Sequence, residues 1–81
     1  MARRVKTTFG ERLRQARRLV DFTQSQLAGE VGVHPITIHR WEQISRLPSA
    51  DHLYKLAAAL GVDADWLALG SVPAKRAAGE V

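Results

Sequence analysis

The side chain with the clearest potential for chemistry is Arg40, which stands in the segment from Thr23 to Glu42, read TQSQLAGEVGVHPITIHRWE. A guanidinium pairs bidentately with O6 and N7 of guanine, and such a pair discriminates between bases by about 1–3 kcal/mol. Thr37 could bond a phosphate or a base edge, or form a backbone bond within its own helical turn. Arg40 could also meet only phosphate or solvent, but the surrounding pattern favours base contact.

Two histidines flank the same region, and their spacing argues against a metal site. His34 and His39 are five residues apart and the chain has no Cys, so neither ligand number nor spacing fits zinc. His34 could instead cap a helix, while His39 could contact a phosphate or face solvent. No Gly-rich phosphate loop follows a strand, and no Ser-His-Asp arrangement is visible. We therefore expect no enzyme activity, no metal and no cofactor.

Length and composition bound the class of protein. With 81 residues, 46% of them hydrophobic, the chain can form one small globular domain. It lacks Cys, which fits a reducing compartment, and no apolar run approaches the roughly 18 residues of a membrane span. The basic start lacks the apolar stretch of a signal peptide. These features predict a cytoplasmic protein with no membrane partner.

Charge is unevenly spread along the chain. The net charge is +4, but residues 1–18 hold seven basic side chains against one acidic, whereas residues 19–81 hold five against seven. A basic end on a small domain is typical of a protein that binds a polyanion. A solvated arm and helix face would give the same pattern, so charge alone leaves both interpretations open.

The first two helices can be placed from their caps. Thr8 and Glu11 have capping-box spacing, which predicts a helix that begins near Thr8 and ends at Asp21. Thr23 begins the second helix, and Gly32 ends it because a sharp turn there needs positive φ. The buried stripe predicted for the first helix consists of Phe9, Leu13, Ala16 and Val20.

The third helix is predicted to begin at Pro35, because a proline at the first helical position gives up no hydrogen bond. Its apolar residues Ile38 and Trp41 should face the core, and a loop over residues 43–48 follows. The pattern predicts that the exposed side of this helix carries Thr37 and its polar neighbours. This helix therefore presents the candidate chemistry described above.

The remaining pattern completes an all-α domain of about five helices. Ser49 caps a fourth helix that Gly61 ends, and Asp63 caps a short fifth helix anchored by Trp66 and Leu69. The fourth helix should bury Leu53, Leu56, Ala57 and Leu60. We expect three parts: a flexible basic arm (1–7), the helical domain (8–70) and a flexible tail (71–81).

Taken in order, these segments resemble the helix-turn-helix domain of the Cro/phage-repressor regulators, also called the xenobiotic-response-element family. The resemblance runs from about Gly10 to Gly70 without an internal gap. It rests on the TQ…LA opening, the small Ala28, the GV turn, the Trp41–Glu42 pair, the LPS before the fourth helix and the final LGV…DWL. The family implies a compact, lambda-repressor-like fold in which the third helix lies in the major groove of DNA.

The resemblance implies roles for individual residues. Gln24 should grip a phosphate, helped by the amides and the dipole at the start of its helix. Arg17 should form a structural ion pair with Glu42, and the family as a whole places the dimer surface at Ala64, Leu67 and Ala68. The implied base-reading residues are His34, Pro35, Ile36, Thr37 and Arg40. The implied phosphate-binding residues are Thr23, Gln24, His39, Ser45 and Arg46.

Two positions depart from the family pattern. The family usually has Gly two residues after the Trp-Glu pair, where this chain has Ile44. A β-branched residue is poorly suited to positive φ, so the third helix is expected to run on or the loop to differ. Related repressors often place amides at positions 35 and 36, but Pro35 and Ile36 cannot pair with adenine and could instead pack on thymine methyl groups.

These observations predict a transcriptional regulator that binds double-stranded DNA sequence-specifically, as a homodimeric repressor on a pseudo-palindromic operator at the nucleoid. An antitoxin, a restriction–modification controller or the DNA-binding fragment of a longer repressor would show the same pattern. The alternative from another class is a protein-interaction module that uses the same fold without reading DNA. Salt dependence separates the two classes, because phosphate-dependent binding weakens steeply with added salt.

Overall fold

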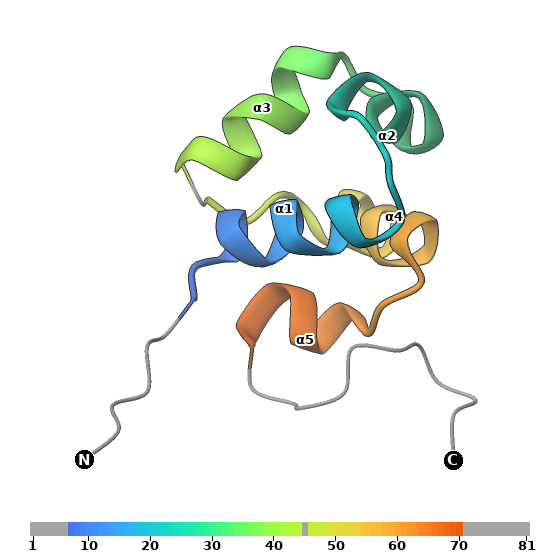
Figure 1. Ribbon diagram of the computed structural model, residues 1–81. Helices are drawn as coiled ribbons and strands as arrows, with labels where there is room; N and C mark the ends of the chain where they lie inside the picture. The colour runs from blue at the N-terminus through green and yellow to red at the C-terminus, as the bar shows by residue number, and fades with distance from the viewer. Residues whose placement is uncertain (1–6, 45, 71–81) are drawn as a thin grey trace.

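The computed structural model describes residues 7–44 and 46–70, and this part of the chain is built from five α-helices (Figure 1). Apart from Thr7, the predicted arm and tail lie outside the described residues, as does Ser45. Within the described ranges, no helix is long and apolar enough to cross a membrane. In chain order the helices are α1 (Phe9–Leu19), α2 (Gln24–Val31), α3 (Pro35–Ile44), α4 (Ala50–Leu60) and α5 (Ala64–Leu69).

Side chains next to the helix starts fix those starts. Thr8 Oγ1 accepts a hydrogen bond from the amide of Glu11 at 3.2 Å, and Glu11 Oε1 accepts one from the amide of Thr8 at 3.1 Å. Thr23 and Gln26 repeat this capping box at α2, at 3.0 and 2.8 Å. The caps of α4 and α5 are Ser49 and Asp63. Each cap satisfies an amide that the helix leaves unpaired, so the predicted starts are confirmed.

The helix ends depend on residues that tolerate the left-handed conformation. Gly32 ends α2 with φ of +86°, and Asp21 follows α1 with φ of +58°. Asp is one of the few residues with a side chain that visits this region at modest cost. Ile44 avoids it by remaining in α3, so the helix runs on as expected and the predicted loop starts later than residue 43.

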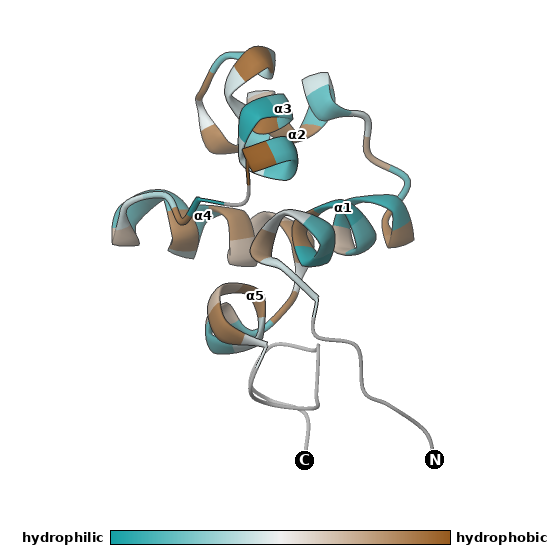
Figure 2. Ribbon diagram, turned by 90° about the vertical axis from the view of Figure 1, so that its left-hand side faces the viewer, coloured by the Kyte–Doolittle hydropathy of each residue, from teal (hydrophilic) through white to brown (hydrophobic). Residues whose placement is uncertain are grey.

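Three layers of helices enclose the core (Figure 1). α2 and α3 pack against each other, α1 contacts α3, α4 contacts α2, and α5 packs beneath both α1 and α4. α3 therefore lies on the face of the domain opposite α5. Figure 2 shows hydrophilic residues interspersed with hydrophobic ones along α3. The core consists of Phe9, Leu13, Ala16, Leu27, Ala28, Val31, Ile38, Leu56, Ala57, Leu60, Val62, Trp66 and Leu67.

Some apolar residues lie elsewhere than predicted. Val20 is 40% exposed because α1 ends one residue before it, so its place in the buried stripe is wrong. In α5, Leu69 is 65% exposed whereas Leu67 is completely buried. α5 packs against both α1 and α4, which lets the successive residues Trp66 and Leu67 point inward. The predicted anchor Leu69 is therefore wrong, and Leu67 takes that role.

An arginine ties the start of α1 to the end of α5. Arg12 is buried, and its guanidinium donates to the carbonyl oxygens of Leu67, Ala68 and Thr7 at 3.0, 2.9 and 2.6 Å. Burial lowers the pKa of Arg12, while the charge of neighbouring Glu11 raises it. A cation is favourable at a helix C-terminus, where carbonyls lack partners. Arg12 thus caps α5 and adds little to the basic surface.

Gly70→Ala is expected to lower the free energy of unfolding by at least roughly 1–2 kcal/mol, the cost of a left-handed non-glycine residue. Gly70 has φ of +67°, and a Cβ there would lie 2.8 Å from Nη1 of Arg12. Urea unfolding followed by circular dichroism measures the change. Gly29→Ala is the matched control, since Gly29 lies inside α2 with open space around its Cβ position. The control should gain about 0.5–1 kcal/mol, and equal stability of both variants would contradict the role of Gly70.

Candidate nucleic-acid interface

A short turn joins α2 to α3 and sets the angle between them. Gly32 donates from its amide to the carbonyl of Ala28 at 2.8 Å, and Val33 donates to the same carbonyl at 3.0 Å. These bonds close the last turn of α2 while the positive φ of Gly32 redirects the chain. Val33 packs on the core that contains Ile38, which is completely buried. The turn therefore presents the opposite side of α3 to solvent.

His34 caps α3. Its Nδ1 accepts from the amide of Ile36 at 3.2 Å, and its carbonyl accepts from the amide of Thr37 at 2.8 Å. The first bond requires Nδ1 without a proton, so the proton of the neutral ring sits on Nε2. Of the two interpretations left open for His34 by the sequence, the structure shows the cap, while Nε2 keeps a donor for a further partner.

The solvent side of α3 carries the predicted base-reading residues. Ile36 is 44% exposed, Arg40 is exposed, and Thr37 is half-buried. Residues three and four apart are neighbours on a helix surface, so these three side chains share one face. Pro35 is half-buried at the first helical position, and His39 is exposed. The apolar side chain of Ile36 and the cationic side chain of Arg40 thus lie on the same face of α3, one helical turn apart.

A buried network joins α3 to α1 and α2. Nε and Nη2 of Arg17 donate to the two carboxylate oxygens of Glu42 at 2.6 and 3.1 Å. Nε2 of Gln24 donates to Oε1 of Glu42 at 3.0 Å, and Nη1 of Arg17 donates to the carbonyl of Phe22 at 2.8 Å. The Glu42 side chain is only 2% exposed. The expected ion pair is present, and it locks the position of α3 relative to the start of α2.

The bond between Gln24 and Glu42 has no signal in the sequence. It occupies the Gln24 carboxamide, for which the sequence predicts a phosphate. The backbone amides of Gln24 and Ser25 remain available to a phosphate at the start of α2, because the side chain of Thr23 accepts from the backbone amide of Gln26. Ser25, which the sequence did not single out, lies exposed in a shallow depression at the start of α2. That depression is lined by Arg17, Arg18, Asp21, Phe22, Thr23, Gln24 and Ser25.

At its other end, α3 is braced against α4. The rings of Trp41 and His52 lie 5.5 Å apart between centroids, and Nδ1 of His52 lies 3.2 Å from Oγ of Ser49. His52, interpreted from the sequence as a surface residue, is half-buried in this contact. Arg46 follows α3 in an exposed position, next to the undescribed Ser45. In the described part of the chain, no group of three or more His, Cys, Asp or Glu residues could hold a metal ion.

The sequence profile of the helix-turn-helix family matches residues 13–67, more than half of the chain. The chain belongs to this helix-turn-helix family. A curated relative, the cryptic phage CTXphi transcriptional repressor RstR of Vibrio cholerae, is 35% identical over 57 residues. The aligned region covers 70% of this chain and 51% of RstR, so the chain spans about half the length of that relative.

Solved structures of helix-turn-helix proteins show the same fold. The P22 c2 repressor in complex with synthetic operator 9T is 32% identical with a TM-score of 0.76, over 82% of this chain and 100% of that chain. The restriction-modification controller protein C.AhdI from Aeromonas hydrophila is 32% identical with a TM-score of 0.68, over 73% and 89% of the two chains. The predicted five-helix, lambda-repressor-like fold and the resemblance to phage repressors are thereby confirmed.

One predicted contact of the helix-turn-helix domain needs correction. Leu67 cannot contribute to a dimer surface, because its side chain is already fully buried in the core of one copy. Ala64 and Ala68 are half-buried, and Leu69 is the large exposed apolar residue of α5. The error arose because a six-residue helix has no clear periodicity, so the sequence could not tell its inner from its outer face.

Proposed function

We propose that this chain is a DNA-binding transcriptional regulator that reads duplex operators sequence-specifically and acts as a repressor. The observation that carries the proposal is the solvent face of α3, where Ile36, Thr37 and Arg40 stand together on a helix locked by Arg17 and Glu42. A recognition helix needs this combination of exposed side chains and a fixed angle to enter a major groove. The likeness to a P22 c2 repressor solved with a synthetic operator supports it.

Each exposed group of α3 suits a feature of DNA. Arg40 would pair with O6 and N7 of a guanine, and Ile36 with Pro35 would pack on thymine methyl groups. Thr37 would contact a base edge or a phosphate, and Nε2 of His34 would donate to an acceptor near the helix start. Phosphate contacts are assigned to Thr23, Gln24, His39, Ser45 and Arg46. For Gln24 the donor is its backbone amide, since its side chain is bonded to Glu42.

The proposed regulator acts as a homodimer. One recognition helix reads only a few base pairs, and two copies would read half-sites about 34–36 Å apart on a pseudo-palindrome. The surface proposed for the dimer is the exposed side of α5, with Leu69 at its centre beside Ala64 and Ala68. α3 is not part of this surface, so it stays free to meet DNA.

Leu69→Lys is expected to raise the dimer dissociation constant by roughly tenfold or more, because it replaces an exposed leucine that would lose most of its water contact on association. Sedimentation equilibrium without DNA measures the change. Tyr54→Lys is the control, since Tyr54 is about as exposed but lies on α4. A dimer that Leu69→Lys leaves intact would show that another surface joins the two copies.

Selection of bound duplexes from a random DNA pool tests the function itself. An enriched palindromic motif is expected for a dimeric reader of operators. Failure to enrich any motif, with weak binding that salt abolishes, would overturn sequence-specific reading. Binding to protein partners through the apolar surface of Ile36 and Pro35 would then be the better explanation of the exposed α3 face.

A further inference from the structure

The arginines of α1 fall into two groups with different surroundings. Arg12 and Arg17 are tied up inside the protein, by helix carbonyls and by Glu42 respectively. Arg14 and Arg18 form no ion pair within the described residues. Arg14 is half-buried and Arg18 is exposed. Their charges are therefore available to a ligand, although the charge count of the sequence does not distinguish them from the other two.

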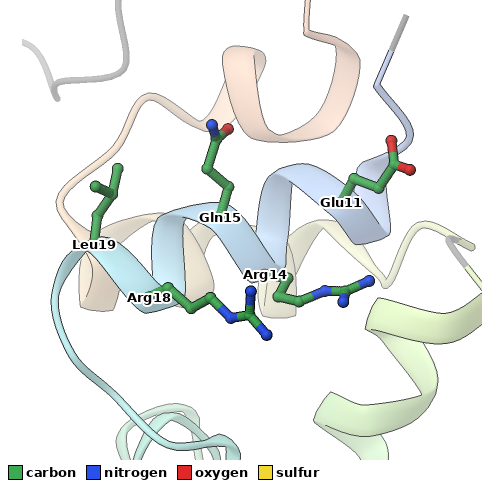
Figure 3. Close-up of a pocket in the computed structure, with 5 residues that line it drawn as sticks. All are labelled: Glu11, Arg14, Gln15, Arg18 and Leu19. Atoms are coloured by element: carbon green, nitrogen blue, oxygen red, sulfur yellow. The ribbon is translucent and has the colours of Figure 1, made fainter.

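Arg14 and Arg18 lie on the same side of the domain as α2 and α3. Figure 3 shows both side chains leaving α1 toward α2 and α3, whereas Gln15 and Leu19 extend toward α5. The helical spacing agrees, because Arg14 is three residues before Arg17, which reaches Glu42 of α3. The two arginines stand one helical turn apart, about 6 Å along the axis.

Arg18 links two neighbouring surface features. It lines the shallow depression at the start of α2 together with Thr23 and Ser25. It also lines a groove along α1 with Arg14. Two acidic residues border this stretch, Asp21 in the first depression and Glu11 at the far end of the second. Arg18 thus joins the depression at the start of α2 to the groove along α1, and no acidic residue lies between the two arginines along that helix.

We propose that Arg14 and Arg18 form an additional phosphate-contacting ridge, which extends the DNA contact from the start of α2 along α1. The inference rests on the proposed DNA-binding function and adds two residues to the phosphate contacts that the family resemblance implies. The ridge carries affinity and salt dependence but no base specificity, because guanidinium contacts to phosphate oxygens do not distinguish sequences. Arg40 and its neighbours on α3 read the bases independently.

The test is a salt series with the purified full chain and two probes, the duplex enriched by selection and a duplex of mixed sequence. For DNA, the slope of log K against log salt changes by about 0.9 for each phosphate that the protein no longer neutralises. Arg14→Gln with Arg18→Gln should flatten the slope by about 1.8 for each bound protomer, which corresponds to about 12-fold less sensitivity per protomer between 50 and 200 mM salt. The base preferences found by selection should not change.

Lys55→Gln is the control for loss of charge alone. Lys55 pairs with Asp51 on α4 and lines a depression beside Gly32, at the other end of α2 from Arg18. It should leave the slope nearly unchanged, whereas each single arginine variant should flatten it by about 0.9 for each bound protomer. Thermal melting should show all variants folded, since none of these side chains is buried in the core.

The outcomes separate the ridge from the function. A wild-type protein that binds neither probe would overturn both the proposed function and the ridge. A wild-type protein that enriches an operator, with a double variant that keeps the full slope, would overturn only the ridge. Equal flattening by Lys55→Gln would also overturn it, because the effect would then reflect net charge and not a local interaction with phosphate.

Discussion

Arg40→Ala is expected to weaken binding to the selected operator by roughly 5- to 150-fold per half-site and to remove the preference for one base pair. The guanidinium of Arg40 is exposed on α3 and forms no ion pair within the described residues, so its donors are available to a guanine. The measurement is binding to a set of operators that differ at one position each. The variant should bind all bases equally at one symmetric pair of positions.

His39→Ala provides the comparison for Arg40. His39 is the neighbouring exposed residue, and its proposed partner is a phosphate. Its removal should weaken binding to every duplex by a similar factor and leave the selected motif unchanged. If Arg40→Ala behaved in the same way, with uniform weakening and a salt slope flattened by about 0.9 per half-site, Arg40 would be a phosphate contact.

The two arginine predictions divide binding into parts with distinct signatures. Removal of Arg40 should change which sequences bind, whereas removal of Arg14 and Arg18 should change how salt affects all of them. This division follows from their places in the fold, since Arg40 lies on the helix that would enter the groove and the other two lie on α1. Measuring both quantities on every variant therefore tests the whole assignment at once.

The helix starts were predictable from the sequence because the responsible interactions are local. Thr8 with Glu11 and Thr23 with Gln26 are three residues apart, and each pair closes its box within one turn. The exposed face of α3 was predictable for the same reason, since helical periodicity alone separates buried Ile38 from exposed Ile36 and Arg40.

Contacts between distant segments could not be predicted from the sequence. In the sequence Arg12 is indistinguishable from a surface cation, yet its guanidinium donates hydrogen bonds to carbonyl oxygens 55 and 56 residues away. The sequence predicts that Gln24 binds a phosphate, yet its side chain donates a hydrogen bond to Glu42, which is 18 residues away. Neither interaction can be recognised from the spacing of residues near Arg12 or Gln24 in the sequence. The ion pair of Arg17 was expected only because the family resemblance supplied it.

The inner face of α5 shows a different limit. Six residues make fewer than two turns, so Leu67 and Leu69 are equivalent in an apolar pattern. Packing against α1 and α4 together decides that Leu67 is inside. The consequence for function is direct, because the side chain left outside is the one that a second copy could cover.

Glu42→Ala is expected to lower the free energy of unfolding by about 3–5 kcal/mol, because it leaves the charge of Arg17 without its partner in a mostly buried place. The Arg17 side chain is only 12% exposed, and Gln24 loses its acceptor as well. For a small domain this is a large share of the total stability. Urea unfolding measures the change. Asp51→Ala is the control, since it breaks the exposed pair with Lys55 and should cost under about 1 kcal/mol.

A paired substitution separates stability from positioning. Arg17→Met with Glu42→Met replaces both charges by apolar groups, which should recover much of the stability that Glu42→Ala removes. It cannot restore the acceptor that holds Gln24 at the start of α2. We therefore expect a folded protein whose affinity for the operator remains reduced. If this variant bound as tightly as the wild type, the network would serve folding alone, and the angle of α3 would be set by packing of Ile38 and Trp41.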